Sequence, residues 1–331
     1  MDKTKRRLLV IAKDSDGSST RYRAGQFVSG IEQGGWQIDI LAVGRGGARR
    51  RQMLAAAAKA DVVLVLRKTF GPLTTWVLRK VARRLIFDFD DAIFLASNGE
   101  PSSMRYRRFA RIVKASDQVW AGNSFLAEMA GGINHGTYLM PTVVDEAKYL
   151  AAGHKRSDAG TIDLVWIGSR STGKYLETLR PVLNELAELC SDFRLKIVAD
   201  FELSDLKMPQ LRVDWSEQIE VVALATAQIA IAPMIDNPWT RGKCGLKVLQ
   251  YMAAGLPVVT DAAGVNQHMV ADRDTGFIVL GHEKWCSAIL ELAANPDLRL
   301  RMGGRGRERL LNKNFTLNHQ TERMAKLLGK V

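Results

Sequence analysis

The sequence has few cysteines and no long apolar run. Its three cysteines, Cys190, Cys244 and Cys286, lie far apart and match neither disulfide nor zinc-finger spacing, which favours a reducing compartment. No stretch approaches the ~20 apolar residues that a membrane-spanning helix needs. The apolar stretch 8–12 follows basic residues but is short and has no cleavage-site pattern, so it is predicted to be a first β-strand and not a signal peptide. None of the five histidines has metal-pair spacing, so no metal site is expected.

Acidic residues are scarce in the first half. Residues 1–150 hold 24 lysines and arginines against 14 aspartates and glutamates, whereas residues 151–331 hold 23 against 21. This imbalance predicts that the first half meets something anionic, such as a membrane surface, a lipid phosphate or a charged glycan. A solvated basic surface is the alternative. No nucleic-acid-binding motif accompanies the charge, so nucleic acid is not an expected partner. We expect a cytoplasmic location, with peripheral binding to the inner face of the cell membrane as a further expectation.

Short β-branched runs alternate with amphipathic helical patterns along the chain. This alternation predicts parallel sheets covered on both faces. The predicted strands are 8–12, 38–43, 61–66, 85–89, 118–121, 137–144, 164–167, 195–199, 229–233, 258–260 and 277–280. The small and polar segment 151–160 interrupts the pattern and is the predicted linker. The simplest architecture is an α/β protein of two doubly wound, Rossmann-like domains facing each other across a cleft, with ligands at the carboxyl ends of the strands.

A glycine- and serine-rich turn follows the predicted strand 164–167. It contains Gly168, Ser169, Arg170 and Lys174, after which a helical pattern begins. Free N–H groups at a helix start bind anions, and the two cations would strengthen such a phosphate site. The segment nearly matches the phosphate loop G-x-x-x-x-G-K-[ST], but Tyr175 replaces the hydroxyl that should hold magnesium. A phosphate-loop phosphotransferase and a purely structural turn are therefore alternatives.

Residues 231–260, IAPMIDNPWTRGKCGLKVLQYMAAGLPVVT, carry a second set of cations. Arg241, Lys243 and Lys247 lie in a loop and in the first turn of the helix that follows. Cations at a helix N-terminus oppose the helix dipole, so an anionic ligand is expected to compensate them. A solvated basic loop is the alternative.

Both segments resemble the retaining family-4 glycosyltransferases of GT-B fold. The segment 252–259, MAAGLPVV, matches the end of the family motif E-G-F-G-x-x-x-x-E-A-M-A-x-G-x-P-V-V. Gly168 and Lys174 match the family's G-R-x-x-x-x-K, with Ser169 at the arginine position and Arg170 one place later. The family's two glutamates fall on Gly242 and Gln250, so the chain resembles a variant branch that lacks the paired glutamates.

The resemblance implies a hexosyltransferase-like enzyme. It would move a sugar from a nucleotide-diphosphate sugar to an acceptor hydroxyl with retention, using no metal or other cofactor, in the synthesis of cell-envelope glycan or glycolipid. A glycan or lipid-linked acceptor is expected. The resemblance implies diphosphate contacts for Lys174 and Arg170, diphosphate or sugar contacts for Lys243 and Lys247, and a ribose contact for Gln250. The predicted donor-binding set is Gly168, Ser169, Arg170, Lys174, Arg241, Lys243, Lys247 and Gln250. Because both glutamates are missing, a non-catalytic sugar-nucleotide-binding GT-B protein is the alternative.

The GT-B resemblance also implies a division of the chain. Residues 1–150 would form the acceptor-side domain and residues 151–314 the nucleotide-sugar-binding domain. Residues 315–331 would form a helix that packs back on the first domain.

Three carboxylates, Asp88, Asp90 and Asp91, end the predicted strand 85–89. Like charges so close together need cations or hydrogen bonds. The Asp-x-Asp pattern is also the metal signature of the GT-A architecture, but GT-A would need one nucleotide-binding fold and not two domains. It is part of the haloacid-dehalogenase nucleophile motif as well, but Ala92 breaks that motif and the strand is the fourth instead of the first. The preferred interpretation is a catalytic cluster facing the cleft, which would orient acceptor hydroxyls or the donor sugar. The alternative is a structural network with Arg83 or Arg84.

The segment 14–23 is predicted to be a polar loop after the first strand. Gly17 would allow a close approach of the backbone to a ligand, and Arg21 or Arg23 would reach a phosphate. Farther along, Asn123 precedes Ser124 in the pattern of a helix N-cap.

Overall fold

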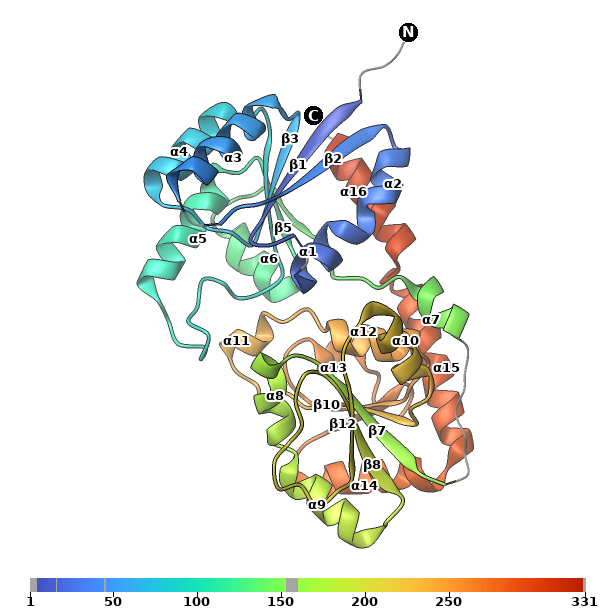
Figure 1. Cartoon of the computed structure of the whole chain (residues 1–331). Helices are drawn as coiled ribbons and strands as arrows, with labels where there is room; N and C mark the ends of the chain where they lie inside the picture. The colour runs from blue at the N-terminus through green and yellow to red at the C-terminus, as the bar shows by residue number, and fades with distance from the viewer. Residues whose placement is uncertain (1–4, 16, 45, 153–159, 330–331) are drawn as a thin grey trace. The chain divides into compact units, whose positions relative to one another are not determined.

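The computed structural model describes residues 5–15, 17–44, 46–152 and 160–329. The chain divides into two compact units. Unit 1 comprises Met1–Val143, Asn237–Cys244 and Leu317–Val331, and unit 2 comprises Val144–Asp236 and Gly245–Thr316. Each unit contains one six-stranded parallel sheet with helices packed on it (Figure 1). The expectation of two parallel α/β units is thus confirmed.

The sheet of unit 1 has the strand order β2-β1-β3-β4-β5-β6. These strands are β1 (Arg6–Ala12), β2 (Trp36–Ala42), β3 (Val62–Leu66), β4 (Leu85–Phe89), β5 (Gln118–Ala121) and β6 (Thr137–Leu139). The helices are α1 (Ser18–Arg23), the 3-10 turn η1 (Gly25–Phe27), α2 (Val28–Gln33), α3 (Gly47–Lys59), α4 (Pro72–Val81), α5 (Ser103–Ala115), α6 (Ser124–Gly131), α11 (Pro238–Arg241) and α16 (Leu317–Gly329). Strands β3, β4 and β5 are buried along their whole length, which explains their unbroken apolar sequences.

The sheet of unit 2 has the order β12-β11-β10-β7-β8-β9. These strands are β7 (Ile162–Ile167), β8 (Phe193–Val198), β9 (Gln210–Val213), β10 (Ile229–Ala232), β11 (Val258–Asp261) and β12 (Gly276–Val279). The helices are α7 (Glu146–Ala152), α8 (Arg170–Glu177), α9 (Arg180–Leu189), α10 (Glu217–Ala225), α12 (Leu246–Ala253), α13 (Asn266–Met269), α14 (His282–Ala294) and α15 (Pro296–Asn312). The chain moves outward from β7 to β9 and then returns to the other side of β7, so β7 and β10 flank the switch point of this sheet.

The final helix, α16, belongs to unit 1. It packs beside α2 (Figure 1). The two helices meet so closely that a Cβ on Gly30 would overlap the Thr321 methyl. Arg84 donates hydrogen bonds to the carbonyl oxygens of Leu327 and Leu328, at 2.7 Å each. A cation bound to the last carbonyls of a helix stabilises its C-terminus.

Several sequence expectations differ from the structure. The predicted strand 137–144 is formed only over Thr137–Leu139, as β6. Strand β9 was not predicted, because it is a partly exposed edge strand with no continuous apolar run. Residues 151 and 152 of the predicted linker belong to α7, and residues 153–159 lie outside the described residues. Among the helices that the structure describes, none is long and apolar enough to cross a membrane.

Candidate functional site

The candidate donor site in unit 2 lies where β7 ends. The chain passes through Gly168 and Ser169 directly into α8. Ser169 has an extended backbone, and its N–H donates to Thr172 Oγ1 at 3.2 Å, so the first turn of α8 is capped. A Cβ on Gly168 would overlap the ring of Trp166, so the turn over this ring requires glycine. The predicted glycine- and serine-rich turn is therefore the start of a helix that follows the central strand of the sheet.

A cation from α12 lies at this helix start. Lys247 Nζ is 3.3 Å from Thr172 Oγ1 and 4.0 Å from the centre of the Trp166 ring. Gly245 precedes α12 in the left-handed region, with φ of 64°, and so allows the sharp entry that brings Lys247 to this place. The N-terminus of α8 and the ammonium group are both positive, and an anion bound there would be attracted by both.

The two cations of the predicted set that lie on α8 are arranged differently. Arg170 turns toward the end of β8, where Nη2 donates to the carbonyl oxygen of Asp200 at 2.8 Å and the guanidinium lies over the ring of Phe201. Lys174 is exposed in the second turn of α8, with Nζ 5.2 Å from the centre of the Tyr175 ring. In a phosphate loop, the G-K-[ST] residues lead into the helix. Here α8 already begins at Arg170, so the structure does not support the phosphate-loop alternative.

Gln250 is buried and takes part in a second polar cluster. Its Nε2 donates to Oε1 of Glu220, on α10, at 2.6 Å. The same carboxylate accepts from Tyr149 Oη and Trp215 Nε1, also at 2.6 Å each. Gln250 was predicted to contact the ribose. Glu220 was not predicted, because it is one of two glutamates in the first turn of a mostly apolar helix and matches no motif. Charge-assisted hydrogen bonds from three neutral donors stabilise this buried carboxylate.

In unit 1, Asp88 forms a buried ion pair with Arg23. Arg23 Nε donates to Asp88 Oδ2 at 2.8 Å, Nη2 contacts Oδ1, and Nη1 donates to the carbonyl oxygen of Met140 at 2.6 Å. Burial raises the pKa of the Asp88 carboxyl above its ordinary value, although Arg23 acts in the opposite direction. This carboxylate lies inside the unit, and the catalytic role predicted for Asp88 stays a prediction. Arg23 is buried as well, and the phosphate contact predicted for it stays a prediction.

Asp90 and Asp91 are less enclosed and share a different cation. Arg67, which directly follows β3, contacts Asp91 through Nη2 and lies 3.2 Å from Asp90 through Nε. Lys243 Nζ donates to the other oxygen of Asp91 at 2.7 Å. Arg67 adopts a left-handed backbone with φ of 55°, which is unusual for a residue other than glycine and is often found at functional sites.

The structural network proposed for the three aspartates therefore exists with different partners. Arg83 pairs with Asp61 at 2.9 Å, and Arg84 binds the end of α16 instead of the acidic cluster. Arginines adjacent to β4 in the sequence lie at its start, whereas Asp90 and Asp91 follow its end. The cations that answer them come from segments distant in the sequence.

The segment Asn237–Cys244 packs against this acidic cluster within unit 1. Asn123 caps α6, as predicted, and its Nδ2 donates to the carbonyl oxygens of Arg241 and Lys243, at 3.0 and 2.9 Å. The Arg241 side chain is exposed at the end of α11. A Cβ on Gly242 would lie 2.6 Å from Ala92 Cβ and 2.7 Å from its nitrogen. The structure thus leaves no room for a side chain at Gly242.

The predicted loop 14–23 is largely helical, because α1 occupies Ser18–Arg23. Gly17 N donates to Asp14 Oδ1 at 2.7 Å, and a Cβ on Gly17 would overlap that carboxylate. The Arg21 guanidinium lies over the ring of Tyr22, 4.5 Å from its centre. Gly17 is therefore needed for a local turn, and its proposed ligand contact and that of Arg21 remain predictions.

Several solved structures have a similar fold. The fold matches a glycosyltransferase from Rickettsia africae with a TM-score of 0.74 and 15% identity, over 98% of each chain. It matches HepE of Anabaena, solved with UDP and glucose, with a TM-score of 0.72 and 12% identity, over 98% of this chain and 100% of that one. WaaG, a glycosyltransferase involved in lipopolysaccharide biosynthesis, matches with a TM-score of 0.69 and 14% identity over the same shares. At these identities the similarity establishes the two-domain GT-B fold.

Part of unit 2 is similar to a known sequence family. Residues 161–295 match the family described as glycosyl transferases group 1. The chain therefore has the GT-B fold, and within it residues 161–295 are similar to glycosyl transferases group 1. This GT-B protein is also 31% identical over 87 residues to trehalose synthase of Pyrococcus horikoshii. That alignment covers 26% of the GT-B protein and only 21% of the relative's length.

Proposed function

We propose that the protein transfers a sugar from a nucleotide-diphosphate sugar to an acceptor hydroxyl, with retention of the anomeric configuration and without a metal ion. The observation that carries the proposal is the meeting of Lys247 with the N-terminus of α8 at the switch point of the unit 2 sheet. Open α/β sheets bind ligands at such a point, and phosphate groups bind at helix N-termini. UDP in the structurally similar HepE supports a nucleotide diphosphate as the ligand.

The proposed donor contacts follow from this arrangement. The diphosphate would lie over Gly168 and Ser169, with Lys247 beside it and Lys174 and Arg170 reorienting toward it. As the glycosidic bond breaks, negative charge develops on the diphosphate. Fixed N–H groups and cations stabilise that charge more strongly than they stabilise the intact donor. The departing phosphate would then accept the proton of the attacking hydroxyl.

The other predicted residues keep more limited roles in the proposal. Gln250 would contact the ribose, and Arg241 and Lys243 would contact the diphosphate or the sugar. Asp90 and Asp91 would orient hydroxyl groups of the acceptor or the sugar. Asp91 is held between Arg67 and Lys243, so a substrate hydroxyl would compete with two cations for its oxygens.

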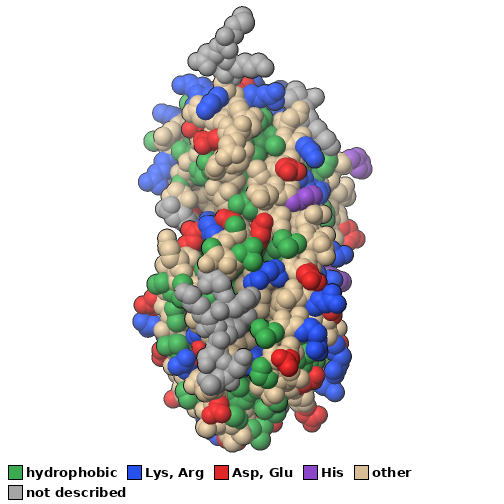
Figure 2. Space-filling view, turned by 90° about the vertical axis from the view of Figure 1, so that its right-hand side faces the viewer, with side chains coloured by type: hydrophobic (Ala, Val, Ile, Leu, Met, Phe, Trp, Pro, Cys, Tyr) green, Lys and Arg blue, Asp and Glu red, His purple; other side chains and the backbone are tan. Residues whose placement is uncertain are grey.

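For the acceptor, we propose an anionic or lipid-linked molecule at a membrane surface. Helices α4 and α5 pack together in unit 1 (Figure 1). Helix α4 exposes Leu73 (73%) and Trp76 (61%), and on α5 the exposed Met104 is close in sequence to Arg107 and Arg108. Apolar and basic side chains together suit anionic lipid headgroups, where each cation contributes about 1 kcal/mol. On the face in Figure 2, by contrast, lysines and arginines are mixed with acidic side chains. The similar fold of WaaG, which takes part in lipopolysaccharide biosynthesis, agrees with a glycan or glycolipid role in the cell envelope.

Calorimetric titration with UDP, followed by UDP-, GDP-, ADP- and CMP-sugars, tests the donor site. We expect Lys247→Ala and Lys174→Ala each to weaken diphosphate binding by roughly 1.5–3 kcal/mol, the contribution of a charge-assisted hydrogen bond. Lys207→Ala is the control, because this exposed lysine of unit 2 pairs with Glu188 on α9. Unchanged affinity in a folded Lys247→Ala variant would contradict the proposed site.

Sugar transfer separates the enzyme from a non-catalytic binding protein. The absence of a glutamate at Gly242 and at Gln250 is the observation that favours the second candidate. An enzyme would transfer the sugar or slowly hydrolyse the donor, and NMR of the product would show the anomeric configuration. Binding without either reaction would favour the non-catalytic alternative. Sedimentation with phosphatidylglycerol vesicles at low and high salt tests the membrane surface, and no binding at low salt would exclude it.

A further inference from the structure

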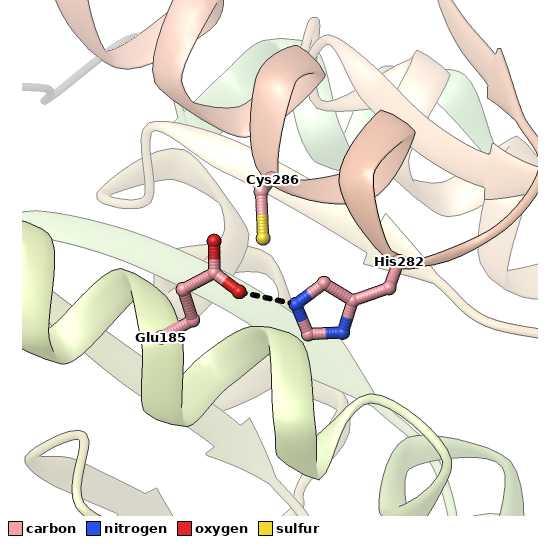
Figure 3. A group of neighbouring side chains, drawn as sticks. All are labelled: Glu185, His282 and Cys286. Carbon is pink, nitrogen blue, oxygen red and sulfur yellow. Dashed lines mark hydrogen bonds and ion pairs between the residues drawn. The ribbon is translucent and has the colours of Figure 1, made fainter.

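Two helices of unit 2 bring three metal-ligating side chains together. Glu185 comes from α9, and His282 and Cys286 come from α14. One ligand atom of each residue lies within 4.8 Å of the other two. Figure 3 shows the Cys286 sulfur pointing toward the place where the Glu185 carboxylate meets the His282 ring.

The sequence and the packing both fix this cluster. His282 and Cys286 are four residues apart, so they lie on the same face of α14. Helix α9 packs against that face through Val182 and Leu186, which share an apolar core with Trp285 and Ile289 on α14. Glu185 lies between those two apolar positions of α9, and its carboxylate contacts Nε2 of His282. The positions of the three ligands therefore depend on the core of unit 2.

We propose that Glu185, His282 and Cys286 form a binding site for a divalent cation of the zinc class. A thiolate, an imidazole and a carboxylate are all common zinc ligands, and water would complete a tetrahedron. Zinc–ligand distances of about 2.0–2.3 Å place neighbouring ligand atoms roughly 3.3–3.6 Å apart, so a small closure of the three side chains is sufficient. The carboxylate and the thiolate together balance the two charges of the ion.

The burial of the three residues suits such an ion. The side chains of Glu185 and His282 are 46% and 40% exposed, whereas Cys286 is buried beneath them. The ion would enter from solvent between the carboxylate and the ring and bind the sulfur on the inner side. Binding would release the thiol proton to solvent and replace the direct contact between His282 and Glu185 with two bonds to the metal. The bound ion would hold α9 against α14.

Titration of the chelator-treated full chain with Co²⁺ tests the site directly. A tetrahedral Co²⁺ site with a cysteine ligand gives a thiolate charge-transfer band and strong visible bands, and Zn²⁺ should remove both by competition. We expect one Co²⁺ per chain. His282→Asn, Glu185→Gln and Cys286→Ser should each weaken binding at least about tenfold. Zn²⁺ should also raise the melting temperature of the unchanged protein, but not that of these variants.

Two control variants locate the metal. Cys190→Ser changes the half-buried cysteine that follows α9, and His268→Asn changes an exposed histidine of α13. Both should bind Co²⁺ like the unchanged protein. No thiolate band, or a band that persists in Cys286→Ser, would overturn the proposal and leave an ion pair above a buried thiol. Should Cys286→Ser fail to fold, His282→Asn and Glu185→Gln decide the question, since both side chains are about half exposed.

Discussion

The buried ion pair between Arg23 and Asp88 allows a structural role to be separated from a catalytic one. Asp88→Asn leaves the Arg23 charge buried without its counter-charge, and Arg23→Met does the reverse. Breaking one partner of a buried pair costs about 3–5 kcal/mol, because the remaining charge stays desolvated. For a unit of this size, that corresponds to a decrease of roughly 6–20 °C in the melting temperature of unit 1.

Differential scanning calorimetry of four proteins measures this effect: the unchanged chain, both single variants and the double variant. Because removal of either partner breaks the same pair, the two effects should not add. The decrease in the free energy of unfolding of the double variant should be at least about 1 kcal/mol smaller than the sum of the decreases of the two single variants. The exposed pair of Arg83 with Asp61 is the matched control, and Asp61→Asn should cost at most about 1 kcal/mol. Single variants that cost less than about 1 kcal/mol, or that are strictly additive, would refute the structural assignment of Asp88.

Three smaller perturbations test other buried contacts. Glu220→Gln removes the carboxylate that accepts hydrogen bonds from three donors. Calorimetry should show that the free energy of unfolding of unit 2 falls by about 1.5–3 kcal/mol, and a decrease below about 0.5 kcal/mol would contradict this. Gly242→Glu should lower the free energy of unfolding by about 1–3 kcal/mol and expose the segment Asn237–Cys244 to trypsin. Unchanged cleavage would mean that the segment accommodates the side chain. Burial, and then the charge of Asp90, raise the pKa of Cys244. The thiol therefore stays protonated in the folded protein. Its contribution to the free energy of unfolding is complete below about pH 8.5, the pKa of a free cysteine, and decreases as the pH rises above that value. Rapid alkylation of Cys244 at pH 8 would contradict this.

The fold was predictable because its signals are local. Strands β3, β4 and β5 are buried on both faces and therefore have continuous apolar sequences. Strand β9 lies at a sheet edge and is only partly buried, so its sequence, QLRV, lacks a continuous apolar run. The start of α8 was also visible, because a glycine and a serine followed a clear strand.

The partners of the polar side chains were not predictable in the same way. The sequence placed Asp88 at the end of β4 but suggested Arg83 and Arg84 as its cations, since these are its neighbours along the chain. The structure instead brings Arg23 from 65 residues away, and Lys243 reaches Asp91 across 152 residues. Such pairs depend on which strands are adjacent in the sheet and on where the chain returns to it, and neither is encoded in the local pattern.

When the chain is aligned with the glycosyltransferase motif, Gly242 and Gln250 take the places of the two glutamates, and the surroundings of each residue explain the replacement. At Gly242 the backbone of Ala92 is so close that no side chain fits. At Gln250 the amide donates to Glu220 at 2.6 Å, so a glutamate there would place two carboxylates in direct contact inside the unit. Such a pair would have to share a proton or separate, at a large cost in free energy. Each replacement is therefore matched to its surroundings, and restoring either glutamate alone would destabilise this chain before it restored a contact to the donor.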